Sequence, residues 1–350
     1  MTIAALGGAL AAALVSAACV AVLVPLLRRA MVVDVPVERS LHDAPVPRGG
    51  GLALVPAVLA GLLATGVLAT GAAPGSLLMT ASFHLILALA TVLTFAIIGL
   101  WDDLYGVSAL ARLLLQIVAA MILSLGILLA ADRSLIWLPV LAATMVALVN
   151  ITNFMDGANG LLGFHGVVSA GWFAVVAAHV DAHGAVALAL AILGAIVGFL
   201  PFNVPAPRVF LGDVGSYLLG AAWAALGAWL LLADARIETV IAPLAVFGAD
   251  TAYTLWLRLR AGQRWYQPHK LHVYQRLVAA GWSHVASSAT VAGVAILCCL
   301  LAVPAMLGAG VTVRLLCLAA MALVCVAYLK LPVRVGAPEP WHKVRTSTLR

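Results

Sequence analysis

Long apolar segments alternate with short polar connections along almost the whole chain. A helix that crosses a bilayer needs about 20 apolar residues at a rise of 1.5 Å per residue. Eleven segments come close to this requirement, and we expect each of them to be helical. They lie near residues 3–27, 51–71, 80–100, 112–131, 135–150, 162–179, 185–203, 215–233, 238–256, 285–307 and 311–330. The pattern therefore predicts an all-α polytopic integral membrane protein with about eleven transmembrane helices, forming a single domain over residues 1–350.

The composition supports the lipid bilayer as the surrounding solvent. Hydrophobic residues occupy 65% of the 350 positions and charged residues only 9%, and the mean hydropathy is +1.14. Soluble globular domains are about half apolar and about one quarter charged. The net charge of +6 fits loops that face anionic lipid, so we expect no nucleic-acid partner.

The basic residues fall mainly on one side of the predicted membrane. If successive connections alternate sides, sixteen of the nineteen Lys and Arg residues gather in the odd-numbered connections and the C-terminal tail. Only Arg133, Arg236 and Arg314 fall on the other side. The positive-inside rule makes the basic side cytoplasmic. We therefore expect the N-terminus outside and the C-terminus in the cytoplasm.

The cytoplasmic connections hold an unusual set of acids. These connections lie near residues 28–50, 101–112, 150–162, 203–215 and 257–284. Asp102, Asp103, Asp156 and Asp213 occur there at one membrane depth, beside glycine-rich turns. An ionised carboxylate near hydrocarbon costs about 2.5–3.5 kcal/mol, so such a group persists where it pairs with a cation or lines a wet cavity. Because Mg²⁺ takes one or two carboxylates together with substrate phosphates, we expect these aspartates to meet around a magnesium ion.

Glycines in the same connections indicate phosphate binding. Gly157 and Gly212 lie beside two of these aspartates, and three consecutive glycines at 49–51 follow Arg48. Glycine permits positive φ and a close approach of the backbone N–H to phosphate oxygens.

Cations in the ninth connection indicate a clamp for a diphosphate. His269, Lys270, His272 and Arg276 lie within eight residues, and a helix there would place His272 and Arg276 on one face. Asp250 is the one acid clearly inside a predicted span. We interpret it as the partner of a nearby Arg or as the edge of the same cavity.

The five connections, taken in order, resemble those of the polyprenyl-phosphate N-acetylhexosamine-1-phosphate transferases, glycosyltransferase family 4. The pair Asp102-Asp103 matches the family's DD motif. The segment NITNFMDG at 150–157 matches NxxNxxDG, and residues 202–216 match the FN-to-GDVGS segment. Residues 34–51 match DxPxxRxxHxxPxPxGGG, and His272 matches the first His of a His-x-His-type loop.

The resemblance implies a role for each matching residue. The residues expected to be catalytic are Asp102, Asp103, Asp156 and His272. Asp213 would ligate Mg²⁺, for which Mn²⁺ can substitute, and Asn203 and Phe210 would hold the uracil ring. The expected substrate-binding residues are Arg39, His42, Arg48, Asn150, Asn153, Gly157, Asn203, Phe210, Lys270 and Arg276.

The resemblance also implies a reaction and a place for it. A UDP-N-acetylaminosugar and polyprenyl (undecaprenyl) phosphate would give a polyprenyl-diphospho-sugar and UMP at the cytoplasmic face of a bacterial inner membrane. The HxxHxYQRLxxxGWSH pattern at 269–284 is closer to the O-antigen branch, which transfers N-acetylfucosamine or N-acetylquinovosamine phosphate and starts lipopolysaccharide glycan synthesis.

Several alternatives stay open. Asn159 stands where many relatives have Asp, and Tyr274 and Gln275 stand where many have His, so their roles and that of His165 are not assigned. An ion-coupled membrane transporter is the alternative class, and its acids would lie near the bilayer midplane. The sugar, the glycan pathway, a one-step or phospho-enzyme mechanism, and a monomer or a homodimer are also undecided.

Overall fold

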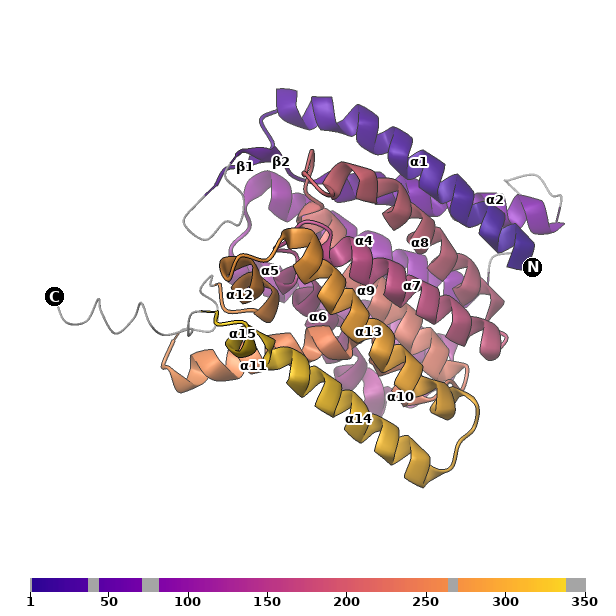
Figure 1. Cartoon of the computed structure of the whole chain (residues 1–350). Coiled ribbons are helices and arrows are strands. Elements are labelled where there is room, and N and C mark those ends of the chain that lie inside the picture. The colour runs from indigo at the N-terminus through magenta and orange to yellow at the C-terminus, as the bar shows by residue number, and fades with distance from the viewer. Residues whose placement is uncertain (1, 37–43, 71–81, 264–269, 338–350) are drawn as a thin grey trace.

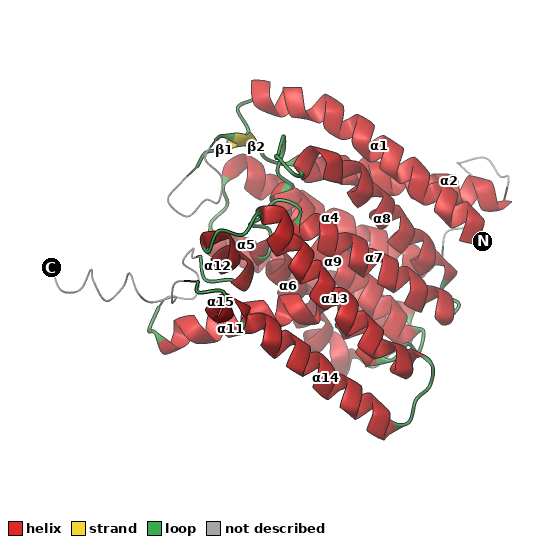
Figure 2. Cartoon of the chain, viewed as in Figure 1, coloured by secondary structure: helices red, strands yellow, loops and turns green. Residues whose placement is uncertain are grey.

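The computed structural model describes residues 2–36, 44–70, 82–263 and 270–337 and shows a bundle of long helices (Figure 1, Figure 2). The helices are α1 (Thr2–Arg29), α2 (Leu54–Thr70), α4 (Phe83–Tyr105), α5 (Ala109–Ala130), α6 (Leu138–Phe154), α7 (Leu161–His179), α8 (His183–Asn203), α9 (Gly212–Leu232), α10 (Ile237–Ile241), α11 (Ala245–Arg260), α12 (Val273–Ala279), α13 (His284–Met306), α14 (Val311–Leu329) and α15 (Leu331–Arg334). Short 3-10 turns are η1 (Gly50–Ala53), η2 (Leu135–Trp137) and η3 (Ala242–Leu244). Two short strands, β1 (Val33–Asp34) and β2 (Val46–Pro47), pair antiparallel.

The helices match the predicted spans in number and order. Ten helices in the described part of the chain are long and apolar enough to cross a membrane. The remaining predicted segment, near residues 51–71, corresponds to the shorter apolar helix Gly50–Gly66. The prediction of an all-α polytopic membrane protein is therefore confirmed. Figure 1 places the start of α1 and the short helix α15 at opposite ends of the bundle, as an odd number of spans requires, and the orientation relative to the cytoplasm stays a prediction.

The predicted boundaries need correction where polar residues continue a helix. The segment 101–112 was expected to be a connection, but Asp102 and Asp103 belong to the last turns of α4. Gly106 ends that helix in the left-handed conformation, at φ 64°, and its N–H donates to the Asp102 carbonyl. Ser108 starts α5 at once by accepting a hydrogen bond from the Ala111 N–H. The acids are thus held on a rigid helix and not on a flexible loop.

Helix α9 forms the centre of the bundle and is buried along nearly its whole length. Helices α4 and α6 pack against it, and Trp223 and Tyr217 are among its fully buried side chains. At the polar end the packing depends on Gly99 of α4, because a Cβ there would lie 2.3 Å from the Asp213 carbonyl oxygen. This close approach lets α4 and α9 bring their acids together.

The glycine run at 49–51 serves packing in the structure. The N–H groups of Gly50 and Gly51 donate to the carbonyl oxygens of Phe210 and Leu211, at 2.9 and 2.7 Å. A Cβ on Gly51 would lie 2.3 Å from the Cα of Gly215. The N–H groups of Gly50 and Gly51 therefore fix the start of α9, and a role of Gly49 in phosphate binding stays a prediction.

Candidate active site

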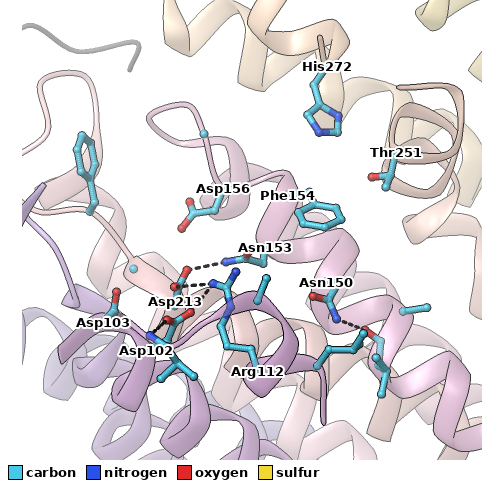
Figure 3. Close-up of a pocket in the computed structure, with 18 of the residues that line it drawn as sticks. Asp102, Asp103, Arg112, Asn150, Asn153, Phe154, Asp156, Asp213, Thr251 and His272 are labelled. Atoms are coloured by element: carbon cyan, nitrogen blue, oxygen red, sulfur yellow. Dashed lines mark hydrogen bonds and ion pairs between the residues drawn. The ribbon is translucent and has the colours of Figure 1, made fainter. Parts of the chain in front are cut away.

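One large cavity opens at the polar end of the bundle, with a volume of about 1270 Å³. Eleven of the fifteen predicted site residues line it, although they come from connections far apart in the sequence. They are Arg48, Asp102, Asp103, Asn150, Asn153, Asp156, Gly157, Asn203, Phe210, Asp213 and His272. Figure 3 shows the aspartates grouped on one side of this cavity and His272 with Thr251 on the other.

Four predicted residues are not part of this lining. Lys270 and Arg276 are described by the structure but do not line the cavity. Arg39 and His42 lie outside the described residues, as does His269, so the structure says nothing about their predicted roles.

Asp102 and Asp103 have different partners, as expected for neighbours on a helix. The Oδ1 of Asp102 accepts a hydrogen bond from the Val107 N–H at 2.9 Å. The Oδ2 of Asp103 accepts one from the Val214 N–H at 3.0 Å, at the start of α9. Arg48 also binds Asp103, since its Nη2 donates to the Asp103 carbonyl oxygen at 2.8 Å. Asp103 thereby links α4 to α9 while its carboxylate lines the cavity.

Arg112 is a site residue that the sequence analysis missed. Its Nη1 lies 2.5 Å from Asp102 Oδ2 and 3.8 Å from Asp213 Oδ2, so one guanidinium serves both carboxylates (Figure 3). In the sequence, Arg112 is one of the sixteen basic residues on the predicted cytoplasmic side. The available signal was its position in the first turn of α5, in the same polar connection as the DD pair.

Asp213 is oriented from the opposite side by an amide. The Nδ2 of Asn153 donates to Asp213 Oδ1 at 2.7 Å and to Ser216 Oγ at 3.0 Å (Figure 3). Asp213 also lies in the first turn of α9, where the helix dipole favours a negative charge. The second Asn of the NxxNxxDG segment therefore holds the predicted metal ligand in place.

Asp156 lies in the turn after α6 and is partly exposed to the cavity. Burial, followed by the nearby charges of Asp103 and Asp34, raises the pKa of the Asp156 carboxyl to about 7. The next residue must be glycine, because a Cβ on Gly157 would lie 2.1 Å from the Oη of Tyr274. This turn is thus packed directly against α12.

His272 projects into the cavity from the side opposite the aspartates (Figure 3). His272 is the N-cap of α12, and its carbonyl oxygen accepts a hydrogen bond from the Arg276 N–H at 3.0 Å, one helical turn away, but only His272 lines the cavity. Its Nδ1 lies 3.0 Å from Asp250 Oδ1. Because His272 lines the cavity, this contact fits the interpretation of Asp250 as the edge of the cavity, and its pairing with an Arg stays a prediction.

Two predicted substrate-binding amides make structural hydrogen bonds. The Nδ2 of Asn150 donates to Gln116 Oε1 at 2.6 Å, which joins α6 to α5. Asn203 accepts from the Gly160 N–H at 2.7 Å and donates to the Val209 carbonyl oxygen at 3.1 Å. Both side chains line the cavity, but these bonds already fix their orientation.

The structure shows what surrounds the four residues whose roles were left open, namely Asn159, His165, Tyr274 and Gln275. Asn159 is held through its backbone, which bonds to the side chains of His284 and Ser288. His165 is fully buried, donates to the Pro243 carbonyl oxygen and stacks on a phenylalanine ring. The hydroxyl of Tyr274 donates to the Phe154 carbonyl oxygen at 3.2 Å. Gln275 accepts from the His272 N–H. Asn159, Tyr274 and Gln275 line the cavity, whereas His165 does not.

Asp102, Asp103, Asp156 and Asp213 form an acidic wall of the cavity, and their oxygen atoms fit a hard divalent cation. Beside the Arg112 guanidinium, the side chains there offer carboxylate and amide oxygens, and no Cys is among the described residues that line the cavity; Mg²⁺ prefers such oxygen ligands. Among the described residues, no three His, Cys, Asp or Glu side chains come close enough to hold one ion by themselves. The expected meeting of four aspartates around one ion is therefore not a closed protein cage. The arrangement suits an ion held by one or two carboxylates and completed by substrate phosphates.

The chain is similar to known proteins of one family. Residues 85–231 match the family described as glycosyl transferase family 4. The chain is 31% identical to a probable undecaprenyl-phosphate N-acetylglucosaminyl 1-phosphate transferase of Bacillus subtilis (strain 168), over 77% of each chain. It is 30% identical to a decaprenyl-phosphate N-acetylglucosaminephosphotransferase of Mycobacterium leprae (strain TN), over 74% of this chain and 73% of the relative. It is 28% identical to a phospho-N-acetylmuramoyl-pentapeptide-transferase of Shouchella clausii (strain KSM-K16), over 68% of this chain and 76% of the relative.

These similarities favour the predicted enzyme over the transporter alternative. They extend over about three quarters of the chain, including the helices that carry the acidic wall. The chain belongs to glycosyl transferase family 4, the polyprenyl-phosphate hexosamine-1-phosphate transferases, and is a phospho-sugar transferase of the membrane.

Proposed function

We propose that the chain transfers an N-acetylaminosugar 1-phosphate from a UDP-sugar to polyprenyl phosphate and releases UMP. The site would face the cytoplasm in a bacterial inner membrane, and the product would enter O-antigen or a related envelope glycan. The supporting observation is that one cavity joins a wall of carboxylates to an apolar groove between two spans. Two relatives are named as N-acetylglucosamine phosphate transferases, which favours N-acetylglucosamine among the candidate sugars.

The apolar groove suits a polyprenyl chain. Beyond the acids, the cavity lining continues along α5 and α6 with residues that are all apolar, namely Leu113, Ile117, Met121, Pro139, Ala142, Ala143, Val146 and Ala147. From Asn150 to Pro139 the groove follows α6 for roughly 16 Å at 1.5 Å per residue. A lipid phosphate could enter sideways from the bilayer and place its head group at the aspartates.

The cavity is large enough for both substrates. Pockets for a single small ligand usually measure about 300–1,000 Å³. At about 1270 Å³ the cavity exceeds this range, and its polar part spans from Asp103 to His272. A nucleotide sugar and a phosphate head group can therefore occupy it together.

The reaction would be an in-line phosphoryl transfer. An oxygen of the carrier phosphate attacks the sugar-bearing phosphorus of the UDP-sugar, and the bond to the UMP oxygen breaks. Such transfers need mainly positioning and neutralisation of charge. A divalent cation held at Asp213 would supply positive charge to the diphosphate.

Side chains of the cavity would orient the two substrates and neutralise their charges. Asp102 or Asp103 orients the carrier phosphate or takes its proton. Arg112 neutralises the acidic wall, so that two anionic substrates can approach it. His272 contacts the diphosphate from the opposite side. Isolation of a phosphorylated aspartate after reaction would rule out direct attack.

The test uses the purified full chain with undecaprenyl phosphate and Mg²⁺. UMP release is measured with UDP-GlcNAc, UDP-QuiNAc and UDP-FucNAc in parallel. We expect turnover with at least one of them, and no turnover with all three would refute the proposal. Asp181→Asn, in an exposed turn at the far end of α7, is the control for variants of the acidic wall.

The groove has its own test. Ala143→Phe fills the groove at an exposed position of α6 and should raise the KM for the carrier without changing the KM for the UDP-sugar. Val140→Phe changes an exposed residue of the same helix that does not line the cavity. Equal effects of the two variants would place the carrier elsewhere.

A further inference from the structure

Asp250 is a completely buried carboxylate in the interior of α11. It accepts hydrogen bonds from the Tyr328 hydroxyl at 2.9 Å, the Val273 N–H at 3.1 Å and the Thr254 hydroxyl at 3.2 Å. The Nδ1 of His272 lies 3.0 Å from the same carboxylate. Three segments, α11, α12 and α14, therefore meet at one acidic side chain.

This arrangement favours one tautomer of His272. Because the Asp250 carboxylate accepts hydrogen bonds from three other donors, we expect the Nδ1 of His272 to donate to it as well. The bond made by one ring nitrogen of a histidine determines the state and direction of the other. The Nε2 of His272 lies on the far side of the ring from Asp250, and this ring lines the cavity (Figure 3).

The surrounding bonds hold the carboxylate as well as the imidazole. Tyr328 belongs to α14, the last long span, and lies 78 residues away from Asp250. The Tyr274 ring stacks on the imidazole, with centroids 5.7 Å apart and an angle of 16° between the planes. Since each group is restrained by another element, the imidazole has one orientation relative to the acidic wall.

We infer that Asp250, fixed by Tyr328, is a positioning residue that directs the Nε2 of His272 at the diphosphate of the nucleotide sugar. With the Nδ1 directed at Asp250, the opposite ring nitrogen is the one available to donate a hydrogen bond to a diphosphate in the cavity. The inference rests on the proposed function for the identity of the substrate. The geometry of the pair can be tested without any substrate.

A purely structural role for Asp250 makes a different prediction. The bonds to Val273 and Tyr328 could serve only to fasten α12 and α14 to α11. In that case the loss of Asp250 would lower stability, and its effect on turnover would be independent of His272. A positioning role requires that the effects of the two residues overlap.

The first measurement is the ¹⁵N spectrum of histidine-labelled full-length protein without substrate, with His272 assigned by comparison with His272→Gln. We expect a protonated Nδ1 at His272 in the wild-type protein and loss of this state in Asp250→Asn. A His272 protonated only at Nε2 in the wild-type protein would overturn the inference.

The second measurement is a kinetic double-mutant cycle. Asp250→Asn should lower kcat about 10- to 100-fold, which is the usual effect of removing the hydrogen-bond partner that orients a functional histidine. The change in KM should be much smaller. The double variant with His272→Gln should be no slower than His272→Gln alone. Losses that multiply in the double variant would overturn the inference.

A milder variant covers the case in which Asp250→Asn does not fold. Tyr328→Phe keeps the ring and removes one hydrogen bond to Asp250, and should reduce kcat in the same direction by a smaller factor. Tyr253→Phe, on α11 but outside the cavity lining, is the matched control and should leave kcat unchanged. Equal kcat for Tyr328→Phe and wild type would count against the inference. A wild-type protein that releases no UMP from any UDP-sugar would instead refute the proposed function and leave the spectroscopic result standing.

Discussion

Removal of the Arg112 side chain should strongly lower kcat/KM, although Arg112 belongs to none of the sequence motifs of the predicted site. In the structure its Nη1 lies 2.5 Å from Asp102 and 3.8 Å from Asp213. Two unit charges 4 Å apart interact by about 4 kcal/mol at an effective dielectric constant of 20. The Arg112 side chain is 32% exposed, so solvent screening reduces this value. We expect Arg112→Ala to lose about 2–4 kcal/mol of transition-state stabilisation, or roughly 30- to 1,000-fold in kcat/KM.

The direction of the magnesium dependence provides a sharper check. Without the guanidinium, the carboxylates of Asp102 and Asp213 lack their shared positive charge and should attract a divalent cation more strongly. The Mg²⁺ concentration that gives half-maximal UMP release should therefore fall in Arg112→Ala, although the maximal rate also falls. Arg112→Lys should recover part of the rate, because a single ammonium can serve one carboxylate but not both.

The control for this series is Arg133→Ala, at an exposed position beyond the far end of α5. It removes the same charge without touching the cavity, and should leave both kcat/KM and the magnesium dependence unchanged. If Arg112→Ala kept the wild-type kcat/KM, or needed more Mg²⁺ than the wild type, the assigned role of this bridge would be wrong.

Three further predictions follow from the same cavity. Asp213→Ala should abolish Mg²⁺-dependent UMP release while the protein stays folded by circular dichroism, and retained turnover would refute the metal assignment. Gly157→Ala should lower kcat at least about tenfold, because the new Cβ collides with the Tyr274 hydroxyl; adding Tyr274→Phe, which removes the colliding atom, should restore part of it, and no recovery would refute this contact. The Asp156 carboxyl has a pKa of about 7 in the folded protein against 3.8 as its ordinary value, so the protonated form favours folding. The wild type, with EDTA present, should therefore lose thermal stability relative to Asp156→Asn as the pH rises from about 4 to about 7; parallel melting temperatures across this range would contradict the raised pKa.

The sequence was most informative where one local rule acts over many residues. Apolar runs long enough to cross a bilayer gave the number and order of the helices, because burying the backbone in lipid demands continuous helix. The same rule showed that Asp102, Asp156 and Asp213 lie at a common depth. Local caps were also readable, since Gly106 and Ser108 carry their signals in the chain itself.

The sequence was less informative about which polar groups face each other. Asn203 is still predicted to bind the nucleotide, but the sequence did not indicate that its side chain also accepts a hydrogen bond from the Gly160 N–H, 43 residues away. The 49–51 glycines were expected to approach phosphate, but the sequence did not indicate that Gly50 and Gly51 pack against the start of α9. Such assignments depend on helix crossings, and nothing in the local pattern of residues reports them.

The sequence by itself determined that this protein is a polytopic helical bundle with a cluster of acids at one end. Only the tertiary structure decided that Arg112 lies between Asp102 and Asp213, and that the Nδ1 of His272 lies 3.0 Å from Asp250. The physical reason is that transfer into lipid is a property of each segment alone. Hydrogen bonds and ion pairs between segments form only after the helices have packed, and small residues such as Gly99 determine how closely they do so.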